Sequence, residues 1–92
     1  MTSQVYKIDT RVTLEADGLD GGGIMFDSFT ASICTCNETA WVILETLQNG
    51  ANLEQLSKRL VDVYDVDNST AQSDVILLLK ELSAMDLVHE QS

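Results

Sequence analysis

Hydrophobic and polar residues in the first part of the chain follow the two-residue period of β-strands. Between Val5 and Leu14 the alternation is partial, with Val12 and Leu14 on one side and Arg11 and Thr13 on the other. Side chains two positions apart share one face of a strand. The pattern therefore predicts a β-strand in this region, with one face toward a core.

A segment rich in turn residues separates this strand from a second β-like stretch. Residues 16–23 read ADGLDGGG, and glycine reaches positive φ angles at little cost. The spacing matches neither G-x-G-x-x-G nor a P-loop, so we predict a plain hairpin loop. Residues 24–36, IMFDSFTASICTC, interleave apolar residues with Ser and Thr, and Asp27-Ser28 divides them in two. Together these segments predict a three-stranded antiparallel sheet.

The hydrophobic period becomes helical after the second cysteine. Asn37 is a good N-cap residue, and the pairs Asn52–Gln55 and Ser69–Gln72 have the spacing of capping boxes. Apolar residues then recur at steps of three and four. In the three predicted helices these are Ala40, Ile43, Leu44 and Leu47; Leu53, Leu56, Leu60, Val63 and Tyr64; and Ala71, Val75, Leu78, Leu82 and Met85. Three strands followed by three short helices predict an α+β fold, a small winged helix-turn-helix domain.

Composition and charge narrow the classes of partner. The 92 residues are 45% hydrophobic and 22% charged, which is typical of one folded domain, residues 1–92. The net charge of −10 repels nucleic acids and anionic membranes, so we expect neither as a partner. Charged residues interrupt any N-terminal signal sequence, and the longest apolar run, Val75–Leu79, is too short to span a bilayer. We therefore expect a cytoplasmic protein with reduced cysteines.

The two cysteines, Cys34 and Cys36, raise the question of a metal or redox site. A structural zinc needs four ligands, and His89 is the only histidine in the sequence. Redox pairs are normally C-x-x-C at a helix N-terminus. Residues 34 and 36 share one face of a strand, and free cysteine packs as a small hydrophobe. We therefore predict both in the core, with regulatory oxidation as a weaker alternative, and expect no catalytic residues, metal or cofactor.

The third predicted helix is more apolar than one buried face requires. Ile76 lies away from the core stripe, beside Lys80 and Ser83, and Leu77 faces elsewhere again. Two explanations stay open: the domain covers both flanks or dimerises, or a groove beside the helix accepts a partner.

The segment before the first helix has the properties of an open sheet edge. Residues 31–36, ASICTC, are β-prone and uncharged, and contain no Lys or Pro to discourage strand pairing. If this strand lies at the edge, an extended peptide could add to it through backbone hydrogen bonds.

One spread-out pattern of apolar and polar positions joins these elements over residues 10–89. Its members are Cys36-Asn37, Ala40, Ile43-Leu44, Leu47, Gly50, Leu53, Leu56, Leu60, Tyr64, Asp74-Val75, Leu78-Leu79, Leu82 and Leu87-Val88. This pattern resembles the PqqD-like proteins, the stand-alone form of the recognition element for RiPPs, which are ribosomally synthesised and post-translationally modified peptides. Cys36 stands where that family usually has Leu. The strands lack the aromatic and Pro-Glu features of members from the pyrroloquinoline quinone pathway, so a lasso-peptide or other RiPP pathway fits at least as well.

The resemblance implies a non-catalytic peptide chaperone with a winged helix-turn-helix fold. Such domains bind the leader of a precursor peptide as an added strand beside the third helix. They present it to a modifying enzyme, such as a radical S-adenosylmethionine enzyme or a leader peptidase. The implied peptide-binding residues are Ala31, Ser32, Ile33, Cys34 and Thr35 in the strand and Gln72, Val75, Ile76, Leu79, Lys80 and Ser83 on the third helix.

Two other functions remain to be weighed against peptide binding. The chain could be a structural subunit that forms a homodimer through its open edge. It could also be a winged-helix DNA-binding regulator with the third helix as reader. That helix region carries Lys80 against Asp74, Glu81 and Asp86, which disfavours DNA.

Overall fold

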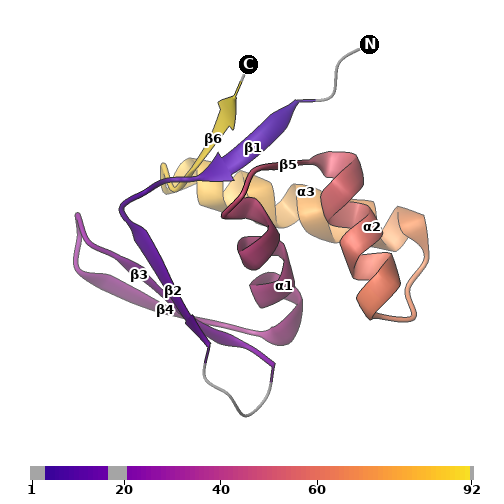
Figure 1. Cartoon of the computed structure of the whole chain (residues 1–92), viewed down its shortest axis with the longest axis horizontal. Coiled ribbons are helices and arrows are strands. Elements are labelled where there is room, and N and C mark those ends of the chain that lie inside the picture. The colour runs from indigo at the N-terminus through magenta and orange to yellow at the C-terminus, as the bar shows by residue number, and fades with distance from the viewer. Residues whose placement is uncertain (1–3, 17–20, 92) are drawn as a thin grey trace.

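Two small antiparallel sheets lie along two sides of three helices (Figure 1). The computed structural model describes residues 4–16 and 21–91. Their elements are β1 (Val5–Ile8), β2 (Val12–Ala16), β3 (Gly23–Asp27), β4 (Ser32–Cys36), α1 (Glu38–Leu47), β5 (Ala51–Asn52), α2 (Leu53–Val63), α3 (Asn68–Ala84) and β6 (Val88–Gln91). The predicted α+β class is confirmed.

The predicted three-stranded meander is the sheet β2–β3–β4. Leu14 and Cys34 lie opposite Met25 on either side of β3. Residues 17–20 of the predicted hairpin loop lie outside the described residues. A Cβ atom at Gly23 would come within 2.6 Å of the Trp41 ring and 2.4 Å of the Glu15 carbonyl oxygen. Only glycine at this position lets α1 pack so closely on the sheet.

The prediction of one strand between Val5 and Leu14 is wrong, because a tight turn divides it. The Asp9 carboxylate accepts the backbone N–H of Arg11 at 2.9 Å, and the Asp9 carbonyl accepts that of Val12 at 3.0 Å. The chain thereby leaves β1 and enters β2 in a different sheet. β1 pairs with β5 and β6 in the order β5–β1–β6. Neither β5 nor β6 was predicted, since β5 has two residues and β6, VHEQ, is largely polar.

The helix starts follow the predicted capping residues in two cases of three. Asn37 caps α1, and the capping box Asn52–Gln55 forms at α2. α3 begins earlier than predicted: the Asp67 carboxylate accepts the backbone N–H of Thr70 at 2.7 Å, and Ser69 lies inside the helix. The predicted Ser69 cap is therefore wrong, because a carboxylate two residues upstream satisfies the free N–H groups.

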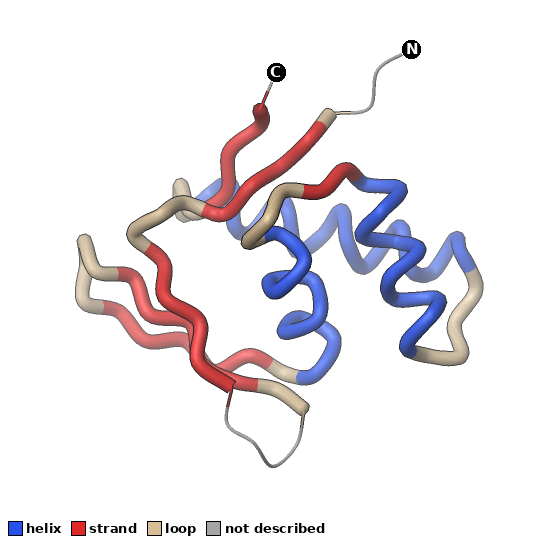
Figure 2. Tube along the Cα trace, in the orientation of Figure 1, coloured by secondary structure: helices blue, strands red, loops and turns tan. Residues whose placement is uncertain are grey.

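The hydrophobic core lies around α1, which runs between the sheet β2–β4 and the other helices (Figure 2). Every strand and helix contributes at least one side chain to it. The buried hydrophobic residues are Ile8, Val12, Met25, Cys36, Trp41, Ile43, Leu44, Leu47, Ala51, Leu56, Leu60, Ala71, Val75, Leu79, Leu82, Leu87 and Val88.

The buried face of α3 differs from the predicted stripe at its edges. Ala71, Val75 and Leu82 are buried as predicted, and Leu79 joins them. Met85 is 46% exposed, so its predicted place in the core is wrong. Met85 is the C-cap residue of α3 and follows its last helical residue, Ala84. Leu78 is only partly buried, which leaves one flank of α3 open.

Leu47 and Leu77 offer a matched test of this core. Leu47 is fully buried, whereas Leu77 is 60% exposed. We expect Leu47→Ala to lower the free energy of unfolding by about 2–5 kcal/mol, because it leaves a cavity, and Leu77→Ala to change it by less than about 0.5 kcal/mol. Urea unfolding followed by circular dichroism measures both. Equal losses would contradict the position of α1 in the core.

The cap of α3 makes a second, pH-dependent prediction. Hydrogen bonds from the Thr70 hydroxyl and backbone N–H hold the pKa of Asp67 below its ordinary value of 3.8. Because the folded state favours the carboxylate, the stabilisation is present above pH 3.8 and disappears as the pH falls through the folded-state pKa. Asp67→Ala should therefore lower the urea midpoint at neutral pH and have little effect near about pH 2. Asp67→Asn keeps a capping oxygen but not the charge, so it should lower the midpoint at neutral pH less than Asp67→Ala does. A deficit of Asp67→Ala that is independent of pH would contradict the role of the charge.

Candidate functional site

Within the part of the chain that the structure describes, β2 and β4 are both edge strands of the sheet β2–β3–β4, and β4 is the uncharged one. β4 pairs with β3 alone, so its other edge presents unpaired backbone N–H and C=O groups. The strand begins at Ser32. Ala31 has a φ of 57° and belongs to the turn before it, so Ala31 is not a strand residue as predicted. The edge itself, SICTC, is uncharged.

The inner face of β4 is only partly covered. Cys34 and Cys36 share this face as predicted, since Cys34 lies opposite the buried Met25. Cys36 is buried, and burial raises the pKa of its thiol, with a smaller contribution from Cys34. Cys34 is exposed, so the prediction that both cysteines lie in the core is wrong. A hollow of about 290 Å³ opens above it, lined by Met25, Asp27, Thr30, Ser32, Cys34, Met85 and Leu87.

A second hollow lies past the end of β4. Its volume is about 340 Å³, and it is lined by Asn37, Thr39, Ala40, Ile43, Asp74, Leu77, Leu78 and Glu81. α3 thus borders both hollows, with Met85 near the start of β4 and Asp74 near its end. Met85 shares the first hollow with Ser32 and Cys34, and Asp74 shares the second with Asn37, so α3 runs in the opposite direction to β4. We call the edge of β4, these two hollows and the facing flank of α3 the β4–α3 groove.

Arg11 joins the two walls of this groove at one end. Its Nε lies 3.1 Å from Oδ1 of Asp27, a contact between charges without hydrogen-bond geometry. Its Nη2 donates to the Met85 carbonyl at 3.2 Å, and its guanidinium lies 4.8 Å from the centre of the Phe29 ring. Asp27 also accepts the backbone N–H of Phe29 and the hydroxyl of Thr30. One side chain therefore ties the β3–β4 turn to the C-terminal end of α3.

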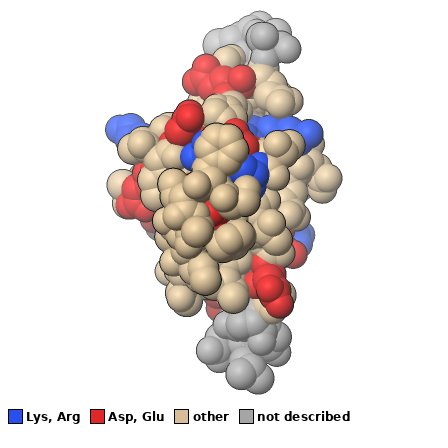
Figure 3. All heavy atoms as spheres, turned by 90° about the vertical axis from the view of Figure 1, so that its left-hand side faces the viewer, with Lys and Arg blue, Asp and Glu red and all other residues tan. Residues whose placement is uncertain are grey.

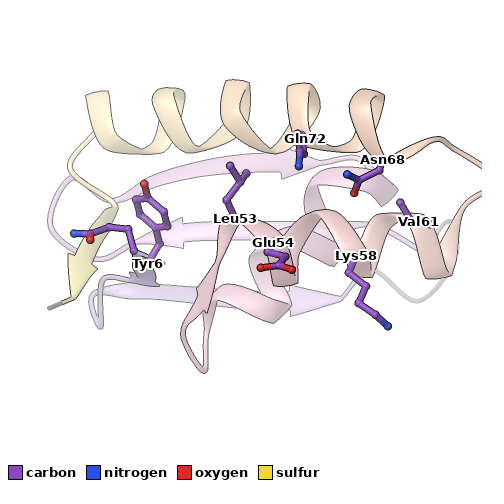
Figure 4. A pocket seen from close by; sticks show the side chains of 8 residues that line it. Tyr6, Leu53, Glu54, Lys58, Val61, Asn68 and Gln72 are labelled. Atoms are coloured by element: carbon purple, nitrogen blue, oxygen red, sulfur yellow. The ribbon is translucent and has the colours of Figure 1, made fainter. Parts of the chain in front are cut away.

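The predicted residues of α3 lie on the opposite flank of that helix. Ile76, Leu79, Lys80 and Ser83 line a hollow of about 350 Å³ together with Tyr6, Leu53 and Glu90. Gln72 lines a neighbouring hollow of about 610 Å³ between α3, α2 and β1 (Figure 4). We call this pair the β1–α2–α3 hollow. At about 100° per residue, its α3 residues and those of the β4–α3 groove fall on opposite sides of the buried stripe. Val75 is fully buried in that stripe and lines neither.

The structure therefore divides the predicted site. The residues of β4 and the residues of α3 are each brought together, but they do not face one another. Within β4, Ser32 and Cys34 face the groove, whereas Ile33 and Thr35 lie on the outer face of the sheet, opposite Phe26 and Ile24. On the other flank of α3, Asp74, Leu77, Leu78 and Glu81 line the hollow shared with α1, and Met85 at the end of the helix lines the hollow beside β4. None of these five was among the predicted site residues.

The outer face of the sheet is a second exposed apolar surface. Ile33 is 66% exposed and Phe29 80% exposed, and Ile24 and Phe26 are each 36% exposed. Viewed with the left-hand side of Figure 1 toward the reader, the molecule shows a broad uncharged area with charged side chains mostly around its margin (Figure 3).

Neither a cluster of metal ligands nor a membrane-spanning helix is found among residues 4–16 and 21–91. No three His, Cys, Asp or Glu side chains there are grouped so that they could hold a metal ion. His89 instead contacts the Asp9 carboxylate at 2.7 Å, beside the turn between β1 and β2. No helix in these ranges has the length and apolar character needed to cross a bilayer.

Two solved structures share this fold. One is described as TbiB1 in complex with the TbiA(beta) leader peptide, with a TM-score of 0.79 and 20% identity, over 94% of this chain and 98% of that one. The other is lasso peptide synthetase B1 complexed with the leader peptide, with a TM-score of 0.74 and 19% identity, over 91% and 96%. At these identities the likeness establishes the fold.

The sequence comparisons place the chain in a family. No curated protein matches it. The family model of coenzyme PQQ synthesis protein D (PqqD) matches residues 22–88, from the start of the β3–β4 hairpin to the start of β6. The match covers both walls of the β4–α3 groove and most of the core. The chain therefore belongs to the PqqD family.

Proposed function

We propose that this protein binds the leader of a ribosomally made precursor peptide and delivers it to a modifying enzyme. The observation that carries the proposal is the unpaired, uncharged edge of β4 beside an open apolar flank of α3. Membership of the PqqD family supports it. So does the fact that two proteins of the same fold were solved with leader peptides.

The leader binds as a fourth strand of the sheet, paired with Ser32–Cys36. In an extended peptide, alternate side chains point to opposite faces. One set enters the groove beside Cys34, Leu78 and Met85, and the other set lies on the outer face next to Ile33. Main-chain hydrogen bonds supply affinity for any extended peptide, and the hollows select the side chains.

The interaction energies agree with a moderate affinity. Four or five hydrogen bonds at ~1 kcal/mol each and two buried side chains at ~2 kcal/mol each give about 8 kcal/mol. Ordering a flexible peptide costs roughly 2–5 kcal/mol. Micromolar binding corresponds to about −8 kcal/mol, so at least one further anchor is needed. The second hollow, past the end of β4, supplies a place for it.

The proposal includes no catalytic step on this chain. The edge and the groove bind and present a peptide, and the chemistry belongs to a partner such as a radical S-adenosylmethionine enzyme or a leader peptidase. We place this activity in the cytoplasm, where precursor peptides are made. A homodimer through β4 would compete with the leader for the same edge, and a net charge of −10 on each copy opposes it.

Ile76 and Leu77 decide which flank of α3 binds the leader. They are neighbours on one helix, 40% and 60% exposed, and they face the β1–α2–α3 hollow and the β4–α3 groove respectively. We expect Leu77→Gln to weaken leader binding about tenfold, because an apolar contact is lost, and Ile76→Gln to weaken it less than twofold. The measurement is an NMR titration of labelled protein with leader peptides from the reading frames next to its gene.

The pattern of results separates the possible sites. In the wild type, shifts should concentrate at residues 32–36 and 74–85. A larger effect of Ile76→Gln would place the peptide in the β1–α2–α3 hollow, on the residues first predicted from the sequence. No shifts with any neighbouring leader, in a folded monomer, would contradict leader recognition itself.

A further inference from the structure

The charged side chains that line the β4–α3 groove are all acidic. Asp74 and Glu81 line the hollow past the end of β4, and Asp27 lines the other hollow. Arg11 engages Asp27, whereas among the described residues no Lys, Arg or His nitrogen lies within 4.0 Å of Asp74 or Glu81. Both of these carboxylates are exposed.

Apart from Arg11, the Lys and Arg side chains of the chain lie away from the groove. Lys58 and Lys80 line the β1–α2–α3 hollow, and Arg59 lines a separate hollow between α1 and α2. Lys7 is in β1, in the other sheet, and Arg11 is held by Asp27 and the Met85 carbonyl. The groove therefore attracts a basic peptide and repels an acidic one, more strongly than the net charge alone would.

The two free carboxylates have a spacing that an extended peptide can match. Asp74 and Glu81 are seven residues apart, which puts them on the same flank of α3 with a separation of about 10.5 Å along its axis. Leu78 lies between them, about 6 Å from Asp74 and 4.5 Å from Glu81 along that axis. Alternate residues of a strand are about 6.7 Å apart, which is more than the axial distances from Leu78 to Asp74 and Glu81. Lys and Arg side chains are long enough to make up this difference in spacing.

We propose that the leader carries a basic–x–apolar–x–basic segment in the β4–α3 groove. Its apolar side chain packs on Leu77 and Leu78, and its two Lys or Arg side chains pair with Asp74 and Glu81. This inference rests on the proposed function and adds to it the chemical class of leader that the protein accepts. Asp74 and Glu81 are then specificity residues, since backbone pairing with β4 does not distinguish one peptide from another.

The test combines a groove variant with a leader variant. The probes are a synthetic leader from the neighbouring precursor gene and the same peptide with every Lys and Arg changed to Gln. The proteins are the wild type, the double variant Asp74→Asn/Glu81→Gln, and the control Glu45→Gln/Asp65→Asn. The control removes the same charge from exposed sites outside the groove. Fluorescence anisotropy gives each Kd at about 20 mM and about 300 mM NaCl.

The expected result is a coupling between the two changes. At low salt the groove double variant should bind the unchanged leader about three- to tenfold more weakly than the wild type does. It should bind the Gln-substituted leader as the wild type does. The control variant should change either Kd less than twofold, and high salt should reduce the difference between groove variant and wild type.

Other outcomes overturn the inference, and they differ from failure of the proposed function. A leader that binds equally well without its basic residues, or to the groove double variant, overturns the charge pairing while leader binding stands. Equal effects of the groove and control variants also overturn the charge pairing, because the attraction would then depend on the net charge of the protein and not on Asp74 and Glu81. If no leader binds the wild type, both proposals fail. A pair of charge reversals, Glu81→Lys in the protein and Lys→Glu in the leader, checks the pairing directly. If the second change restores the binding that the first one weakened, the weakening was not caused by a loss of fold.

Discussion

The contact of Arg11 with Asp27 determines how the two parts of the groove meet. Both side chains are about nine-tenths buried, at 13% and 9% exposed. From the turn between the two sheets, the guanidinium reaches the end of β3, the Met85 carbonyl and the Phe29 ring. Loss of either charged partner would leave the other buried and uncompensated, which costs several kcal/mol in comparable pairs, about 3–5. This contact therefore holds the C-terminal end of α3 at a fixed place beside the β3–β4 turn.

The groove exists because the core stops short of the sheet edge. Cys34 points toward the core side of the sheet but is exposed, and Met85 and Leu77 are 46% and 60% exposed. A protein selected for stability alone would close this gap with larger side chains and protect β4 with a charge or a proline. An unpaired edge strand leaves backbone N–H and C=O groups free, which a protein needs if its ligand binds as an added strand.

The sequence was sufficient for local structure and for the family, and insufficient for the orientation of elements. The meander, the three helices and the caps at Asn37 and Asn52 follow from short-range patterns. The turn at Asp9 was missed because the alternation continues through it, and Arg11 was taken for an outward strand residue. The flank of α3 that faces β4 could not be chosen, since Ile76 and Leu77 are both apolar and only the packing of the two sheets separates them. The positions of Arg11 and α3 depend on contacts between residues that are far apart in the sequence, and local patterns do not reveal these contacts.

The most direct test of leader binding by strand addition is to detect the pairing itself. In a complex of isotope-labelled protein with unlabelled leader, isotope-filtered NMR reports contacts between the two backbones. Strand addition predicts a ladder of such contacts between the peptide and Ser32–Cys36, with peptide side chains close to Leu78 and Met85. A bound leader whose contacts lie at Tyr6, Leu53 and Ile76, or whose backbone is helical, would contradict it.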